Sequence, residues 1–433
     1  MFRKLIILGV LPAALAAQQP DTGYRPISLT DAVRLAKENN VSAVTAGNSV
    51  RAANLQVRSS RAQLYPTFSA SAGQSKQAGD RLGQSGQIVS YTSAWTYNTG
   101  LSSSLTLFDG GKAFADMRKS KADVASAQAG ETNTDANLAL QVKTQYNAIL
   151  AAKEAEAAAR AQLEVAQQQL DMSIAKVNAG AANVSDSLKG VVGVGNAELA
   201  MLNAQQGVRA ASAALTHLVG TPYFVTANPS DTVAIPPLTV DSATLVQMAL
   251  EGPSVRAASA SLTAANASIR SARSAYLPSL SASASYNGNG AGASYGLNNN
   301  PYPYSRSLSL RFNYPIFNGY SRENQIANAQ IAAENADAQI KDTKLQAQQT
   351  IITQIGALKN AEAKMRVQQT SVRASEEDLR VSQQRYALGA GTLLDVLTSQ
   401  QNLIIARQSL IQARLDYRNA RAQIEQAVGR DLP

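Results

Sequence analysis

Apolar side chains recur every seven residues through two long stretches without proline, 67–221 and 316–432. In the second stretch one series is followed by another that is displaced by two positions, or roughly 200° around a helix. The two series are Ile351, Leu358, Met365, Val372, Leu379 and Tyr386, and then Val367, Ala374, Val381 and Leu388. A seven-residue period is typical of supercoiled helices. Apolar stripes on two faces predict a neighbour on each side, as in the wall of a helical cylinder.

A shorter period marks four other segments, in which apolar and polar residues alternate. Alternation places the two kinds of side chain on opposite faces of a strand. We therefore expect strands at about 67–77, 97–108, 279–288 and 304–314. Each is about ten residues long, the length of a tilted strand that crosses a membrane.

Segments rich in Gly, Asn and Ser connect the strands of each pair, at roughly 73–92 and 287–300, and are expected to be exposed loops. Four aromatic residues lie near these segments and fit either an aromatic girdle at the membrane interface or ordinary loop packing. They are Trp95, Tyr97, Tyr302 and Tyr304.

A helix is predicted before each strand pair. Ser28 begins a capped helix that is expected to run to about Leu64, where Pro66 ends it. The corresponding helix of the second half is expected from about Asp241 to Leu277, before Pro278.

The long helical stretches are interrupted once each, at turns that share a pattern. Gly389 and Gly391 end one helix, and Thr392 offers an N-cap for the next. Gly180 and Asp186 precede Gly389 and Asp395 by 209 positions each (389 − 180 and 395 − 186). Phe108 and Phe317, and Gly220 and Gly429, have the same separation. This constant offset indicates an internal duplication. We expect repeats at 28–220 and 240–429, a linker at 221–239, and hairpin tips at 178–186 and 388–395.

The duplicated order of helix, strand pair and long helical hairpin resembles the TolC family of outer-membrane efflux proteins. So does the turn that begins at Tyr386 and continues through Gly389 to Asp395. The resemblance implies a mainly α fold with a membrane β-barrel: a homotrimer whose twelve-stranded barrel continues as a periplasmic α-helical barrel. It also implies two partners, a periplasmic adaptor and an inner-membrane pump, besides outer-membrane lipid.

The family's functional positions lie at the hairpin tips. By this resemblance the periplasmic aperture would include Tyr386, Asp395 and Asp186, and the adaptor would dock at Gly180, Val184, Gly389, Gly391 and Leu393. The family's aperture network also has an arginine and a second aspartate, but Gly391 and Thr398 occupy those positions here. Asp395 has an alternative role, because a carboxylate near a helix N-terminus also caps it.

Export and oligomerisation are expected from the remaining features. Residues 1–16 combine Arg3 and Lys4 with an apolar run and a small-residue cleavage site, as in a signal peptide. Cysteine is absent, which excludes disulfides and a lipid anchor on cysteine. Four strands cannot close a barrel alone, and exposed strand edges are not tolerated in lipid. Several copies must therefore combine their strands.

The sequence offers no credible active site, cofactor site or metal site. The single histidine, His217, lies near a predicted helix end, where capping or packing is the simpler role. Gly190, Gly193 and Gly195 superficially resemble a phosphate-binding loop, but they lack the preceding strand and the Lys-Ser/Thr pair. The net charge of +9 comes from basic residues interleaved with acids, so nucleic acid is not an expected partner.

The leading interpretation is a passive outer-membrane exit duct for small molecules or drugs. The channel of a type I protein-secretion system is an alternative within the same architecture. A non-porous structural protein of the envelope is a third.

Overall fold

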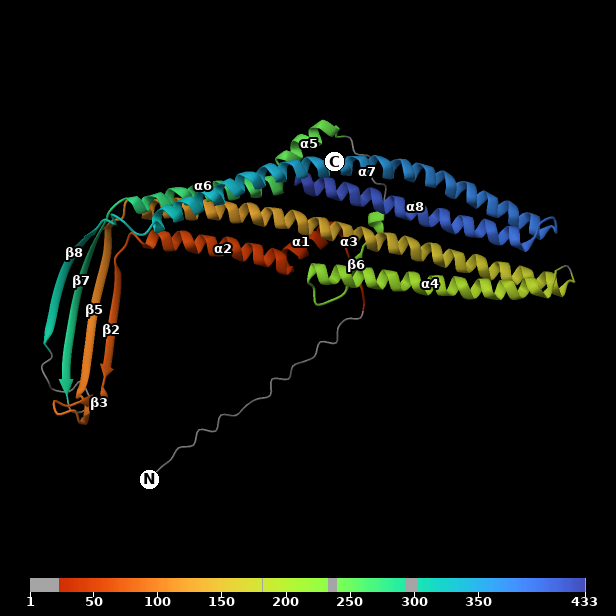
Figure 1. Cartoon of the computed structure of the whole chain (residues 1–433). Helices are drawn as coiled ribbons and strands as arrows, with labels where there is room; N and C mark the ends of the chain where they lie inside the picture. The colour runs from red at the N-terminus through yellow and green to blue at the C-terminus, as the bar shows by residue number, and fades with distance from the viewer. Residues whose placement is uncertain (1–22, 181, 233–239, 293–302, 433) are drawn as a thin grey trace, which may run out of the picture.

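The computed structural model describes residues 23–180, 182–232, 240–292 and 303–432. Two helices dominate it, α3 (Lys112–Asn178) and α7 (Ser321–Ala387), each of 67 residues. At 1.5 Å per residue each spans on the order of 100 Å. In Figure 1 a β-sheet lies at one end of these helices and the two hairpin turns lie at the other. The expected signal peptide, 1–16, lies outside the described residues.

Shorter helices lie along the two long ones, placed end to end in pairs (Figure 1). α2 (Val41–Ala62) and α4 (Val184–Val219) both pack against α3, while α6 (Pro253–Arg273) and α8 (Leu393–Val428) lie between α3 and α7. The helices therefore form a wall of four rows: α2 with α4, then α3, then α6 with α8, then α7. The outer rows have a partner row on one side only within the described chain.

The two helices expected at 28–64 and 241–277 are each broken, which corrects that prediction. α1 (Leu29–Asn39) stops at Asn40, whose side chain accepts from Ser42 N at 2.9 Å to cap α2 and donates to Leu218 O at 2.9 Å. α5 (Ser242–Leu250) likewise stops before Gly252. A Cβ atom at Gly252 would lie 2.1 Å from Ala427 O. The end of α4 therefore contacts the first break at Asn40, and the end of α8 contacts the second break at Gly252.

Four antiparallel strands form one sheet in the order β2-β5-β7-β8: β2 (Thr67–Ser75), β5 (Trp95–Phe108), β7 (Ser279–Gly292) and β8 (Tyr304–Asn313). Serines pair across one face, as in Ser283 with Ser309 and Ser285 with Ser307, both at 2.8 Å between hydroxyl oxygens. The other face carries exposed Leu308, Leu310 and Phe312. β2 and β8 each have one strand edge without a partner in this sheet.

Aromatic residues at the loop end lie on the apolar face of the sheet. Tyr304 stacks on Tyr286 with ring centroids 5.0 Å apart, and the register from Leu101 places Trp95 and Tyr97 on that same face. For Tyr304, which is exposed, this placement fits a girdle, whereas Tyr97 is only 7% exposed and fits the packing alternative. Tyr302 lies outside the described residues.

The segment 73–92 is not simply an exposed loop. It contains a second hairpin, β3 (Ala78–Leu82) paired with β4 (Ile88–Thr92), in addition to the end of β2. β7 also extends beyond the expected end at 288, to Gly292.

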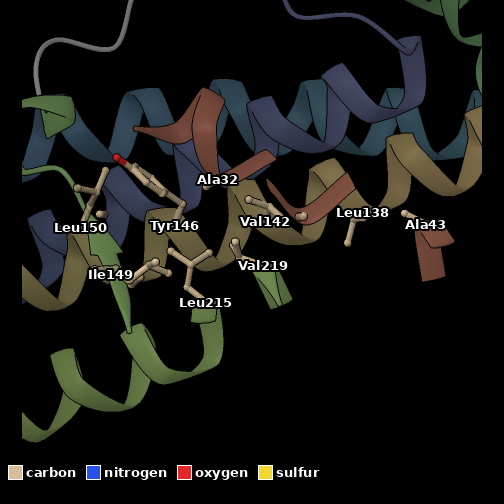
Figure 2. Packing of buried hydrophobic residues seen from close by; sticks show 12 residues of the cluster. Ala32, Ala43, Leu138, Val142, Tyr146, Ile149, Leu150, Leu215 and Val219 are labelled. Atoms are coloured by element: carbon tan, nitrogen blue, oxygen red, sulfur yellow. The ribbon is translucent and has the colours of Figure 1, made fainter. Parts of the chain in front are cut away.

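The linker 221–239 contains a strand that joins the two ends of the first repeat. β6 (Val225–Ala227) pairs in parallel with β1 (Arg25–Ile27), and all three β6 residues are buried. Tyr146 of α3 lies beneath them, donating its hydroxyl to Ile27 O and accepting from Asn228 N, both at 3.0 Å. Figure 2 shows the surrounding core, in which Val142, Ile149 and Leu215 pack between α1, α3 and α4.

The seven-residue series of apolar residues differ in whether they are buried within the chain. The first series of α7 is buried against α8, with Ile351 fully buried. α8 also carries two seven-residue series, one that includes Val396, Leu403 and Tyr417 and one that includes Ala406, Ala413 and Ala420, and these residues are all buried inside the chain. The second series of α7 remains exposed, with Val367 at 64% and Leu388 at 84%. Among the described helices, none combines the length and apolar character needed to cross a membrane.

Candidate functional site

The two hairpin tips are sharp turns that glycine makes possible. Gly180 follows α3 with φ of 67°, and Gly389 follows α7 with φ of 72°, in the left-handed region. At the second tip, Gly389 N donates to Tyr386 O at 3.1 Å and Ala390 N donates to Arg385 O at 2.8 Å. These two bonds satisfy carbonyls that the end of α7 would otherwise leave without partners.

The returning helices start with different caps. Asn183 accepts from Ser185 N at 3.2 Å to begin α4, with Asp186 in the first turn. At α8, Thr392 and Asp395 form a reciprocal capping box: Asp395 N donates to Thr392 Oγ1 at 3.2 Å, and Thr392 N donates to Asp395 Oδ2 at 2.9 Å. The alternative role considered for Asp395, helix capping, is therefore present in the structure.

The capping box also sets the ionisation of Asp395. The backbone N–H and the hydroxyl of Thr392 both donate to its carboxylate and lower its pKa below the usual value. Arg385 adds a smaller effect in the same direction. An exposed, negatively charged group thus remains at the tip at neutral pH.

Tyr386 points into the hairpin and not away from it. It is 5% exposed and packs with Leu379, Leu393, Val396 and Leu403. Its hydroxyl has no hydrogen-bond partner among the described residues. Within one chain, Tyr386 therefore helps to hold α7 against α8.

Lys176 connects the two hairpins, and sequence reasoning missed it. Its ammonium lies 3.9 Å from the centroid of the Tyr386 ring and donates a hydrogen bond to Tyr386 O at the end of α7. A basic residue in the last turn of α3 is a common helix-ending signal, so its position alone did not indicate a partner 210 residues away.

Of the residues expected to contact the adaptor, some are exposed to solvent and one is buried. Val184 is 59% exposed, and Gly180, Gly389 and Gly391 lie at the turns. Leu393 is only 4% exposed, which corrects its expected place on the docking surface, because it packs into the Tyr386 cluster. The exposed apolar residues at this tip are Leu388 and Leu394.

Thr398, at the position of the family's second aspartate, does not connect the hairpins. Its hydroxyl donates to Leu394 O at 2.9 Å, within α8. The tips of one chain are therefore joined by Lys176 and Tyr386, while Asp395 and Thr398 make contacts inside their own hairpin.

Comparison with known proteins identifies this architecture. The model of the family described as outer membrane efflux protein matches residues 32–221 and 245–430. The chain belongs to this family. It is an outer-membrane efflux channel protein that extends into the periplasm, and the family is not enzymatic.

Curated relatives match over most of their length. The probable efflux pump outer membrane protein TtgC of Pseudomonas putida is 25% identical over 412 residues, with 93% of this chain and 83% of TtgC covered. Protein CyaE of Bordetella pertussis is 26% identical over 372 residues, with 83% and 75% covered.

Solved structures confirm the predicted TolC-like fold of the chain, with duplicated long helical hairpins and strands. The CusC structure has a TM-score of 0.75 at 20% identity, and 94% of each chain is covered. The open state of the MtrE outer membrane channel of Neisseria gonorrhoeae has a TM-score of 0.72 at 22% identity, with 93% of this chain and 89% of MtrE covered.

Proposed function

We propose that three copies of this chain assemble into one continuous exit duct, in which the strands form a closed twelve-stranded sheet and the helices form a cylinder below it. The observation that carries this proposal is the coincidence of open edges. The sheet ends in β2 and β8, and the helix wall ends in the α2/α4 row and α7. The sheet and the helix wall thus both have unpaired edges on the same two sides of the protomer. Twelve is an even number of strands within the usual range for outer-membrane proteins.

Exposed apolar stripes on the two edge helices support this assembly. α4 exposes Val184, Leu188, Val191, Leu199 and Leu202. α7 exposes Ile331, Leu345, Ile352, Val367 and Val381. Pairing α7 of one copy with the α2/α4 row of the next would cover the stripe of α7 along its length and bury that of α4, which hydrophobic burial favours. It would also give α7 the second neighbour that its heptad pattern predicts.

The hairpin tips would then surround the inner entrance of the duct. In this arrangement Asp395 and Asp186 lie near the aperture, while Gly180, Val184, Gly389 and Gly391 form the surface offered to a periplasmic adaptor. The exposure of Val184 and Leu388 supports a partner at this surface, because apolar side chains at a periplasmic tip are otherwise in contact with water.

Small molecules are the proposed cargo. Two relatives, each 25% identical to this chain, are named as an antibiotic and a toluene efflux pump outer membrane protein. The duct itself would be passive, and an inner-membrane pump coupled through the adaptor would supply the energy.

Conductance across planar lipid bilayers tests the proposal. The wild-type chain is expected to give stepwise ion conductance. Val367→Glu places a charge in the exposed stripe of α7 and is expected to abolish both assembly and conductance. Gln369→Glu is the matched control, since it lies roughly 200° around the same helix. Absence of conductance from assembled wild-type protein would contradict the duct.

A further inference from the structure

Two basic side chains lie on the apolar face of the sheet, near its loop end. Arg306 of β8 lies opposite Tyr286 on that face. Lys76 directly follows β2 and alternates onto the same face as Gln74, which lies opposite Tyr97. Both cations are exposed. In the proposed duct this face contacts lipid, where a basic side chain is tolerated only near the headgroups.

Each of the two cations lies beside an aromatic ring. The guanidinium carbon of Arg306 is 5.5 Å from the centroid of the Tyr286 ring, on which Tyr304 stacks. The ammonium of Lys76 is 5.8 Å from the centroid of the Trp95 ring. Tyrosine and tryptophan are enriched where a membrane meets water. The rings therefore place both cations at the level of the lipid headgroups.

The sheet supplies no anion to these cations. The four strands β2, β5, β7 and β8 contain no acidic residue. Asp80, the one acid of the β3–β4 hairpin, accepts a hydrogen bond from Ser90. A ring restrains a cation through its quadrupole but neutralises no charge. The positive charge at this end of the face is thus available to an anion from outside the chain.

Closure of the sheet would bring the two cations together across the boundary between copies. Within one chain they lie at opposite edges, because β2 and β8 are the outer strands of the sheet (Figure 1). Strands of a barrel tilt by about 35–45° and lie about 4.8 Å apart. Over the four strands of one copy, this tilt staggers the register by roughly four to six residues.

The extent of the edge strands gives the direction of the stagger. Straight across one sheet, the register places Arg306 level with Ala70 of β2. A stagger toward the loop end puts residues 74–76 of the next copy opposite Arg306, and β8 then pairs with β2. The reverse stagger puts residues 64–66 there, which precede β2. Lys76 therefore lies opposite Arg306 of the neighbouring copy, or one side-chain pair from it.

We propose that each boundary between two copies binds the phosphate of an anionic lipid in the outer leaflet, through Arg306 of one copy and Lys76 of the next. The planar guanidinium can donate two parallel hydrogen bonds to a phosphate, and the ammonium adds a compact charge. The acyl chains would lie along the exposed leucines of β8. This inference rests on the proposed duct, because two copies build the site.

Native mass spectrometry of the full chain in detergent tests the site, with bisphosphorylated lipid A as the probe. We expect a trimer that retains one lipid per boundary and little of the same lipid without its phosphates. Arg306→Gln and Lys76→Gln should each weaken retention by about tenfold or more. Arg311→Gln is the matched control, because Arg311 lies on the same strand but on the serine face, opposite Ser281. It should retain the lipid as wild type does.

Cross-linking tests whether the two cations meet across the boundary. The chain has no cysteine, so paired cysteines react without background. A short bismaleimide should link copies of the Lys76→Cys/Arg306→Cys variant, since within one chain these positions are about 14 Å apart or more. The Lys76→Cys/Arg311→Cys variant should remain unlinked.

The outcomes separate this site from the duct itself. A trimer that retains no lipid A, or that retains it equally in wild type and Arg306→Gln, would overturn the site and leave the duct. A trimer in which Lys76→Cys/Arg306→Cys is not linked would do the same. A chain that stays single would overturn the site and the duct together.

Discussion

Lys176 and Tyr386 join the two hairpins of one chain at their tips. The ammonium of Lys176 lies over the Tyr386 ring at 3.9 Å from its centroid and also donates to the Tyr386 carbonyl. The carbonyl belongs to the last turn of α7, where a positive charge is favourable. The interaction therefore fastens the start of the second turn to the end of α3.

Replacing Lys176 by methionine should loosen the tips. The substitution keeps an apolar stem but removes the charge, with a loss of about 1 kcal/mol for the contact with the ring. We expect a higher resting conductance of the reconstituted duct and little change in its assembly. Lys364→Met, on an exposed face of α7, is the control. Equal resting conductance in the two variants would show that the Lys176 contact does not restrain the tips.

The variant Asp395→Asn tests whether Asp395 lines the pore or only caps the start of α8. If Asp395 faces the aperture, three copies form an acidic ring that favours cations. The variant is then expected to have lower cation preference in single-channel recordings, while Asp378→Asn, on an exposed part of α7, retains it. Unchanged selectivity in Asp395→Asn would leave the capping box as the function of this residue.

The capping box also sets the pH dependence of the start of α8. Hydrogen bonds from Thr392 lower the pKa of Asp395, so its charge persists to more acidic pH than for an ordinary aspartate. A carboxyl with a lowered pKa contributes stability above its unfolded pKa and loses it as the pH falls through the folded value. The α8 cap of the single chain should therefore survive mild acid and weaken only below about pH 4, as followed by circular dichroism.

Two glycine substitutions should change stability in opposite directions. Gly389 has φ of 72°, so Gly389→Ala is expected to destabilise the tip by about 1 kcal/mol. Gly356 lies within α7 with open space at its Cβ position, so Gly356→Ala is expected to stabilise by up to about 1 kcal/mol. Urea unfolding followed by circular dichroism measures both. A stabilising Gly389→Ala would contradict the left-handed turn.

Lys143 joins the first repeat to the end of the second. Its ammonium lies 2.6 Å from Glu425 Oε2 and also bonds Asp431, and its side chain is only 15% exposed. Burial alone would lower the pKa of Lys143, but the hydrogen bonds to Asp431 and Glu425 outweigh burial and raise it. Lys143→Met should cost about 2 kcal/mol, because Glu425 loses one of its partners.

A raised lysine pKa stabilises the fold below the unfolded pKa, and that contribution is lost as the pH rises through the folded value. The stability difference between wild type and Lys143→Met should thus be constant from neutral pH to about pH 10 and shrink above it. A difference that instead disappears on mild acidification would contradict the assigned charge pair.

The sequence predicted the elements whose signals are local. Pro66, Pro278 and the glycines at 180 and 389 mark ends of helices through backbone chemistry that needs no partner. The breaks at Asn40 and Gly252 were missed although both carry local signals, because Asn40 caps α2 through Ser42 N and Pro253 begins α6. Only their contacts with α4 and α8 lie far away in the sequence. Lys176 was missed because its partner lies on the other hairpin. The buried position of Leu393 depends on how α7 packs against α8 within the second hairpin.

The central claim is that this chain is one third of a closed duct. Native mass spectrometry of the full chain, extracted in detergent, tests it most directly. The account predicts a complex of three chains: the two open edges of the sheet and of the helix wall require several copies, and the number three is the one that the family resemblance implies. A single chain that retains its helical circular dichroism would contradict it.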